Sequence, residues 1–88
     1  MTQSELDKRF HEAYEKASNM TEALPQDVML RIYAYYKQAT LGNPMYRQSH
    51  PNDLRNAFKI NAWIQVSHLS ADEAKEKYIE IINSLTQL

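Results

Sequence analysis

Apolar residues recur about every three or four positions in four segments of the chain, and polar residues fill the positions between them. This spacing is typical of amphipathic helices that bury one face. It predicts helices over about residues 4–18, from Pro25 to just before Gly42, over about 53–66, and from Ala71 toward the C-terminus. The four apolar stripes are Leu6, Phe10, Ala13, Tyr14 and Ala17; Val28, Ile32, Tyr35 and Ala39; Leu54, Ala57, Phe58, Ala62 and Val66; and Ala74, Tyr78, Ile81, Ile82 and Leu85.

Residues that favour helix ends flank these segments. Ser4 is the expected N-cap of the first helix, because a serine hydroxyl accepts a hydrogen bond from a free backbone N–H group. Pro25 suits the first turn of the second helix, and Gly42 suits its C-terminal cap, since glycine enters the left-handed conformation without steric cost. Ser70 and Glu73 have the spacing of a capping box, which predicts the start of the fourth helix.

The composition favours a small, all-helical protein. The 88 residues include one glycine and three prolines, too few turn residues for a sandwich or barrel of many short strands. Four short amphipathic helices bury their stripes best against one another, so we expect an all-α, four-helix up-down bundle. The length predicts one domain, residues 1–88. Loops are expected at residues 19–24 and 43–52.

Several classes of protein are excluded or disfavoured by the composition. The chain has no cysteine, which excludes disulfide frameworks, thiolate zinc sites and cysteine nucleophiles. The first residues lack the pattern of a signal peptide, and no apolar run approaches the ~20 residues of a membrane span. We therefore expect a soluble, cytoplasmic protein that does not span a membrane. Because no large additional apolar face is evident, the expected state is a monomer.

The charges are unevenly distributed although the formal net charge is only −1. Residues 31–59 carry five basic side chains and one acid, whereas the other acids lie before residue 28 and from residue 72 onward. This distribution predicts a local anion site rather than a surface for a polyanion. It also argues against nucleic-acid binding, which would show a steep loss of affinity with salt. The five basic residues are Arg31, Lys37, Arg47, Arg55 and Lys59.

The second predicted helix carries a polar and aromatic face beside its apolar stripe. Four residues spaced three, four and seven apart share this side of the helix. They are Tyr33, Tyr36, Lys37 and Thr40. Two phenol rings, their hydroxyl groups and a cation would suit a planar heterocycle next to a phosphate. On spacing alone, the commoner explanation is structural, with tyrosines at the edge of the core and a solvated lysine.

The third and fourth predicted helices add three candidates. Arg55 and Lys59 lie four residues apart and repel each other unless an anion or acid lies between them, although a solvated basic edge is the ordinary explanation. Tyr78 lies on an apolar stripe, so it is a core position by spacing. Catalysis and metal binding have little support, because His11 and Glu15 alone do not make a metal site and no nucleophile motif occurs. We expect no enzyme activity, cofactor or metal.

Residues 36–42, Tyr-Lys-Gln-Ala-Thr-Leu-Gly, closely resemble the signature of the acyl-CoA-binding protein family. The resemblance continues without gaps through residues 59–63, 70–74 and 78–79, and so covers nearly the whole chain. It implies a four-helix bundle that binds medium- and long-chain fatty acyl-CoA thioesters without catalysis. It further implies a role in buffering and transporting these esters inside the cell, with acyl-CoA-using enzymes as recipients.

The resemblance also implies roles for individual residues. Tyr36 would stack on the adenine ring. Tyr33, Lys37 and Lys59 would hold the 3′-phosphate of the ribose. The other implied contacts are Tyr78 and Arg55 at the CoA head group, and Met29, Leu30 and Tyr14 along the acyl groove.

The chain departs from the family pattern at three single positions and in residues 47–51, which lack the usual Arg-Pro-Gly pattern. Ile60 stands where the family has a second tryptophan, and Ser18 stands where a lysine assists binding. Tyr14 occupies a position that is commonly small and near the ligand. Our hypothesis is that Tyr14 and Ser18 alter the acyl-length preference or weaken CoA affinity. These departures leave a second class open, a helical protein-interaction module that keeps the fold with weak or no ligand binding.

Overall fold

The computed structural model describes residues 2–41 and 54–86, and all regular structure in these ranges is helical. The helices are α1, Gln3–Ser18; α2, Gln26–Leu41; α3, Leu54–Gln65; and α4, Ala71–Thr86. The predicted all-α class with four helices is therefore confirmed, and residues 19–24 form the predicted connection. The predictions for Gly42 and for residues 43–52 lie outside the described residues. No helix in the described ranges is both long and apolar enough to cross a membrane.

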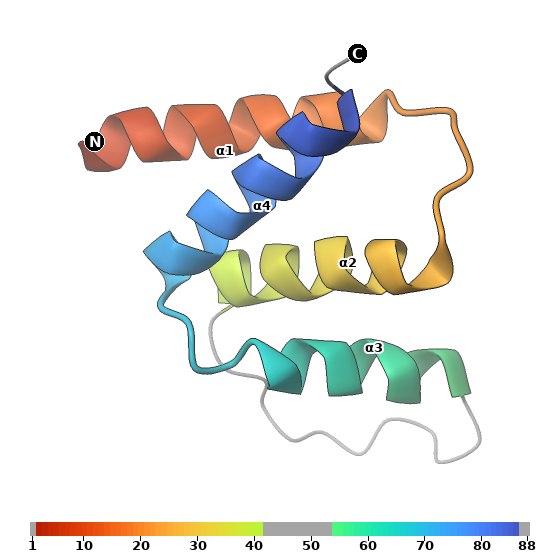
Figure 1. Cartoon of the computed structure of the whole chain (residues 1–88). Helices are drawn as coiled ribbons and strands as arrows, with labels where there is room; N and C mark the ends of the chain where they lie inside the picture. Colours follow the sequence, from red (N-terminus) through yellow and green to blue (C-terminus); the bar gives the residue numbers. More distant parts are fainter. Residues whose placement is uncertain (1, 42–53, 87–88) are drawn as a thin grey trace.

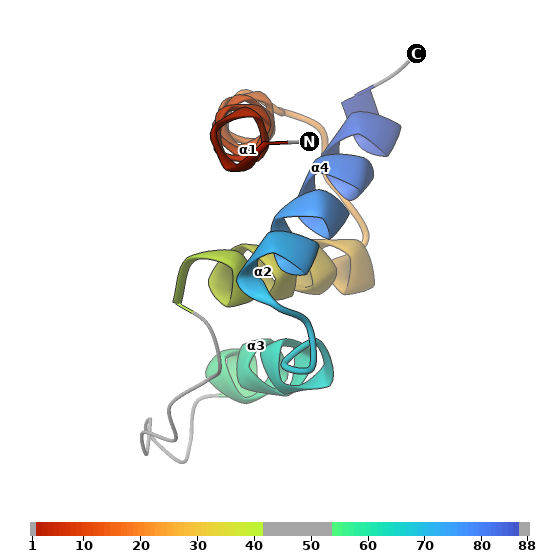
Figure 2. The same ribbon diagram turned by 90° about the vertical axis from the view of Figure 1, so that its left-hand side faces the viewer.

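Helix α4 occupies the middle of the molecule. It packs against both α1 and α2, and α2 also packs against α3. Figures 1 and 2 show α4 running obliquely from α2 to α1, which it passes on one side, with α3 on the side of α2 that faces away from α1. The backbones of α1 and α2 stay apart, and the two helices meet through aromatic side chains such as Phe10 and Tyr36.

The helices do not alternate strictly in direction as they would in a simple up-down bundle. Figure 1 shows α2 and α3 running the same way, from right to left in the view. The twelve residues between them can span up to about 40 Å, whereas a helix of sixteen residues is about 24 Å long. Twelve residues are therefore enough to connect two parallel helices.

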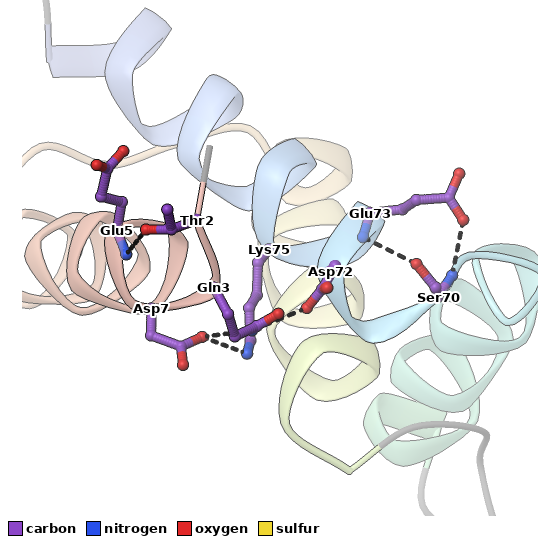
Figure 3. A network of polar contacts seen from close by, with 8 residues as sticks. All are labelled: Thr2, Gln3, Glu5, Asp7, Ser70, Asp72, Glu73 and Lys75. Atoms are coloured by element: carbon purple, nitrogen blue, oxygen red, sulfur yellow. Dashed lines mark hydrogen bonds and ion pairs between the residues drawn. The ribbon is translucent and has the colours of Figure 1, made fainter.

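The predicted N-cap of the first helix, Ser4, is wrong. Thr2 is the N-cap, with an extended backbone (φ −74°, ψ 161°) and a hydroxyl that accepts from the backbone N–H of Glu5 at 3.2 Å. This start places Gln3 in the first turn, where its amide nitrogen donates to Asp7 and, in α4, to Asp72, at 3.1 Å each (Figure 3). The earlier cap thus allows a link between α1 and α4.

The predicted capping box at the start of α4 is confirmed. The Ser70 hydroxyl accepts from the backbone N–H of Glu73 at 3.1 Å, and the Glu73 carboxylate accepts from the Ser70 N–H at 3.0 Å (Figure 3). These hydrogen bonds from Ser70 hold the pKa of Glu73 below its ordinary value. Nearby, the Lys75 ammonium donates to Asp7 at 2.7 Å and lowers the pKa of that carboxyl, which ties α4 to α1.

The core lies where α4 meets α1 and α2. Ala13, Tyr78 and Ile82 are buried at its centre, as the stripes of the first and fourth helices predict. Partly buried apolar side chains surround them: Phe10, Ala17, Ile32, Tyr35, Tyr36, Ile79 and Ile81. The core is therefore shared by three helices, and α3 is attached to its outside.

The predicted core stripe of the third helix is only partly correct. Ala62 and Val66 are half-buried, but Ala57 is exposed and Phe58 is 50% exposed. Among the described helices α3 packs against α2 alone, so only one narrow side of it is covered. The Leu54 side chain lies outside the described part of the structure.

The apolar pattern does not predict the burial of Gln38, whose side chain is only 2% exposed. Its amide nitrogen donates to the backbone carbonyls of Ser67 at 3.3 Å and Leu69 at 2.7 Å. Its amide oxygen accepts from the indole N–H of Trp63 at 3.0 Å. These three bonds fasten α2 to α3 and to the turn that leads into α4.

Candidate functional site

Two lysines from different helices lie against one tyrosine ring. The ammonium of Lys37, in α2, is 5.5 Å from the centroid of the Tyr33 ring, and that of Lys59, in α3, is 5.3 Å from it. All three side chains are half-buried. Burial raises the pKa of Tyr33, so its phenol remains a neutral donor. Two cations at one ring repel each other, and an anion between them would relieve that repulsion.

Tyr36 belongs to an aromatic cluster that also contains Phe10, Tyr14 and Tyr78. Its ring stacks on Tyr14 with centroids 5.2 Å apart and on Phe10 at 5.9 Å, and it is tilted against Tyr78 at 5.9 Å. Phe10 and Tyr78 contact each other at 5.0 Å. Thr40, predicted to share this face, donates its hydroxyl to the Tyr36 carbonyl at 2.8 Å. The cluster holds the Tyr36 ring from several sides.

Tyr78 lies at the bottom of this cluster and is buried. Burial raises its pKa to about 12, and the nearby phenols of Tyr14 and Tyr36 contribute in the same direction. The Tyr78 phenol is therefore neutral at physiological pH. The Tyr36 ring contacts both Tyr14 and Tyr78, so one phenol ring from each of α1, α2 and α4 lies in this cluster.

The protein should lose stability between pH 10 and pH 12 through ionisation of Tyr78. The unfolded chain releases this proton near pH 10 and the folded protein near pH 12, so the stabilisation is complete below pH 10 and falls through this window. The loss should be on the order of 2 kcal/mol. Urea unfolding at pH 8 and pH 11.5 measures it, and Tyr78→Phe should remove most of the difference. An undiminished difference in Tyr78→Phe would contradict this assignment.

A cavity of about 540 Å³, the first cavity, opens beside Tyr33 and Tyr36. It lies between the end of α1, the connection that follows and the start of α2. Glu22 is the one charged residue among those that line it, and most of its surface is apolar. The other lining residues are Ala17, Met20, Ala23, Leu24, Met29 and Ile32. Tyr33 therefore borders an apolar cavity on one side and two ammonium groups on another.

The residues predicted along an acyl groove lie in three different places. Met29 lines the first cavity, whereas Leu30 lines a second cavity of about 460 Å³ between α2 and α3. Tyr14 lines neither cavity and instead stacks on Tyr36.

Arg55, predicted at the head group, is in α3, and its side chain lies outside the described part of the structure. Ser18 donates its hydroxyl to the Tyr14 carbonyl at 2.9 Å.

The sequence analysis does not predict six of the residues that line the first cavity. Apolar spacing places Ala17 and Ile32 on core stripes, and the other four lie in the expected loop: Met20, Glu22, Ala23 and Leu24. One signal could have found Met20 and Leu24, because large apolar residues in a connection that is not part of a helix need a surface to cover. Both are half-buried.

The site suits an amphiphilic anion. The first cavity offers apolar surface, the two lysines offer positive charge, and the phenols between them offer hydrogen-bond donors and ring faces. Within residues 2–41 and 54–86, no three His, Asp or Glu side chains lie close enough together to hold a metal ion.

The chain matches a protein-family model described as "Acyl CoA binding protein" over residues 7–82. Its fold is similar to the crystal structure of Oryza sativa Acyl-CoA-Binding Protein 2, with a TM-score of 0.85 and 31% sequence identity. That similarity covers 91% of this chain and 89% of the rice chain.

Curated relatives include short and long proteins. The acyl-CoA-binding protein of Gossypium hirsutum is 34% identical over 80 residues, which cover 91% of this chain and 90% of the cotton protein. The acyl-CoA-binding protein homolog of Drosophila melanogaster is 29% identical, with 91% and 93% covered. Enoyl-CoA delta isomerase 2 of Rattus norvegicus is 34% identical over 83% of this chain, but this match spans only 20% of the isomerase.

Proposed function

This chain belongs to the acyl-CoA-binding protein family, and we propose that it binds medium- and long-chain fatty acyl-CoA thioesters without acting on them chemically. In this role it buffers and transports the esters in the cytoplasm, as a monomer, and delivers them to enzymes that use acyl-CoA. The names of the cotton and Drosophila relatives support the ligand class.

One observation carries the proposal: Tyr33 and Tyr36 border the first cavity, and the ring of Tyr33 also lies against two ammonium groups. An acyl-CoA has the matching order of parts, since its apolar chain is joined through a polar arm to a phosphorylated nucleoside. The acyl chain enters the first cavity, and the nucleotide lies over the tyrosines and lysines.

The head-group roles follow from the chemistry of the side chains. Tyr36 offers a ring for the adenine, and Lys37 and Lys59 supply charge-assisted hydrogen bonds to the ribose phosphate. Tyr33, a neutral phenol between the lysines, donates to the same phosphate. Tyr78 supports the adenine site through its contact with the Tyr36 ring. The proposed role of Arg55 at the head group rests on its place in the sequence, four residues before Lys59.

The acyl chain is assigned to the first cavity, where Met29 is a lining residue and 55% exposed. An exposed methionine adapts its shape to an apolar partner, which suits a flexible chain. Leu30 lines the second cavity and takes part only if the chain passes between α2 and α3. Tyr14 is assigned to the nucleotide end of the site, because it contacts Tyr36.

Titration of the protein with palmitoyl-CoA in a calorimeter should give a one-to-one complex that is far tighter than binding of free CoA or palmitate. Lys37→Ala should weaken it about 10- to 100-fold, because a hydrogen bond to a charged group contributes about 1.5–3 kcal/mol. Lys59→Ala should act similarly. Lys8→Ala, at an exposed position in α1, is the matched control and should bind like the wild type.

Two outcomes would overturn the proposal. If no acyl-CoA of any length binds, the fold stands and the alternative, a helical protein-interaction module, takes its place. If palmitoyl-CoA binds but both lysine variants behave like Lys8→Ala, the thioester occupies a different site from the one described.

A further inference from the structure

The ring of Tyr14 covers part of the ring of Tyr36. Their centroids are 5.2 Å apart and their planes differ by 28°, so the two rings are stacked. Rings in contact have centroids about 4.5–7 Å apart, which leaves no room for a third ring between these two. A planar heterocycle can therefore reach this face of Tyr36 only after one of the two rings has moved.

Tyr14 is the most exposed of the three aromatic side chains that contact Tyr36. Phe10 is half-buried against the core, and Tyr78 is one of its central residues. Tyr14, in contrast, is 43% exposed and lines neither of the two cavities. Tyr36 itself is held by Phe10 and Tyr78 when Tyr14 leaves. Rotation of the exposed Tyr14 side chain would uncover the part of the Tyr36 ring that Tyr14 covers.

We propose that Tyr14 is a displaceable cover on Tyr36 and that it sets the affinity of this chain for the nucleotide end of its ligand. The inference rests on the proposed function, in which Tyr36 takes the adenine ring. A stacked aromatic pair changes an equilibrium constant by a factor of about two to twelve. Because the ligand must break this pair before it binds, the cover lowers head-group affinity by the same factor.

The test compares the wild type with Tyr14→Ala, which removes the ring, and Tyr14→Phe, which keeps it. Each is titrated with adenosine 3′,5′-bisphosphate and with palmitoyl-CoA. Tyr14→Ala should bind both ligands about two- to twelvefold more tightly than the wild type. Tyr14→Phe should retain the lower affinity, since its ring can still stack. Far-UV circular dichroism checks that each variant is folded, and Tyr14→Leu replaces Tyr14→Ala if the alanine variant is not.

The outcomes separate the inference from the function on which it rests. If neither ligand binds to any of the proteins, the proposed function fails and the cover has no purpose. If the wild type binds palmitoyl-CoA and a folded Tyr14→Ala or Tyr14→Leu binds no more tightly, the cover is refuted while the proposed function stands. Equal tightening in Tyr14→Phe would also refute it, because the ring would then have no part in the effect.

Discussion

Replacing Gln38 with leucine should destabilise the protein by about 2–5 kcal/mol, although leucine is similar in size and more apolar. The change removes three hydrogen bonds, one to the Trp63 indole N–H and one to each of the Ser67 and Leu69 carbonyls. Each lost hydrogen bond is worth about 0.5–1.5 kcal/mol, or about 1–3 kcal/mol where water cannot replace it, and the better burial of leucine offsets only part of the sum. Equilibrium unfolding in urea measures the difference.

Gln65→Leu is the matched control, because Gln65 is exposed near the end of α3 and should tolerate the same change within about 0.5 kcal/mol. Trp63→Phe removes the indole donor. When it is combined with Gln38→Leu, the total loss should be smaller than the sum of the two single losses, since both changes remove the same Trp63–Gln38 hydrogen bond. Strict additivity, or a Gln38→Leu protein as stable as the wild type, would contradict this role of the buried amide.

Gln38 also marks a limit of sequence reasoning about this fold. Periodicity places Tyr78 and Ile82 in the core, because the apolar stripe of α4 is buried where α1 and α2 pack against it. Gln38 is polar and lies on α2, so its burial depends on where Trp63 and Leu69 end up. Those partners lie 25 and 31 residues further along the chain. Rules based on neighbouring residues therefore cannot predict these hydrogen bonds.

The start of α4 was predicted correctly and the N-cap of α1 was not, for a related reason. Ser70 and Glu73 satisfy each other within four residues, so the pattern alone predicts the start of α4. At the start of α1, Thr2 and Ser4 are both acceptable caps by type. The choice of Thr2 places Gln3 where it bonds to Asp72 of α4, which is a contact across the fold.

The candidate site likewise contains contacts within one helix, which spacing predicts, and contacts between helices, which spacing does not predict. Tyr33 and Lys37 share a helix face, so their proximity follows from spacing. The ammonium of Lys59 joins them from α3, and only the resemblance to a known family predicted its place beside them. Tyr14 is a stripe residue by spacing, yet it is exposed and stacks on Tyr36, because the backbones of α1 and α2 do not come into contact. The first cavity lies in the opening between these helices. The spacing of apolar residues along the chain does not predict such an opening.

Affinity for acyl-CoA should rise about fifteenfold for each pair of methylene groups added to the chain, until the chain fills the first cavity. Burial of one methylene is worth about 0.8 kcal/mol, and two therefore change the dissociation constant by about this factor. From octanoyl- to dodecanoyl-CoA the expected gain is about 200-fold. Competition calorimetry with octanoyl-, decanoyl- and dodecanoyl-CoA measures the slope. A flat series would mean that the acyl chain stays in water.

Filling either cavity identifies where the acyl chain lies. Ala23→Trp, at an exposed lining position of the first cavity, should flatten the dependence on chain length and leave the affinity for adenosine 3′,5′-bisphosphate nearly unchanged. Ala62→Trp partly fills the second cavity, which Leu30 also lines, and should keep the wild-type slope. The opposite result, a flat series in Ala62→Trp alone, would move the acyl chain to the space between α2 and α3. The nucleotide would then stay at the lysines, and Leu30 rather than Met29 would contact the chain.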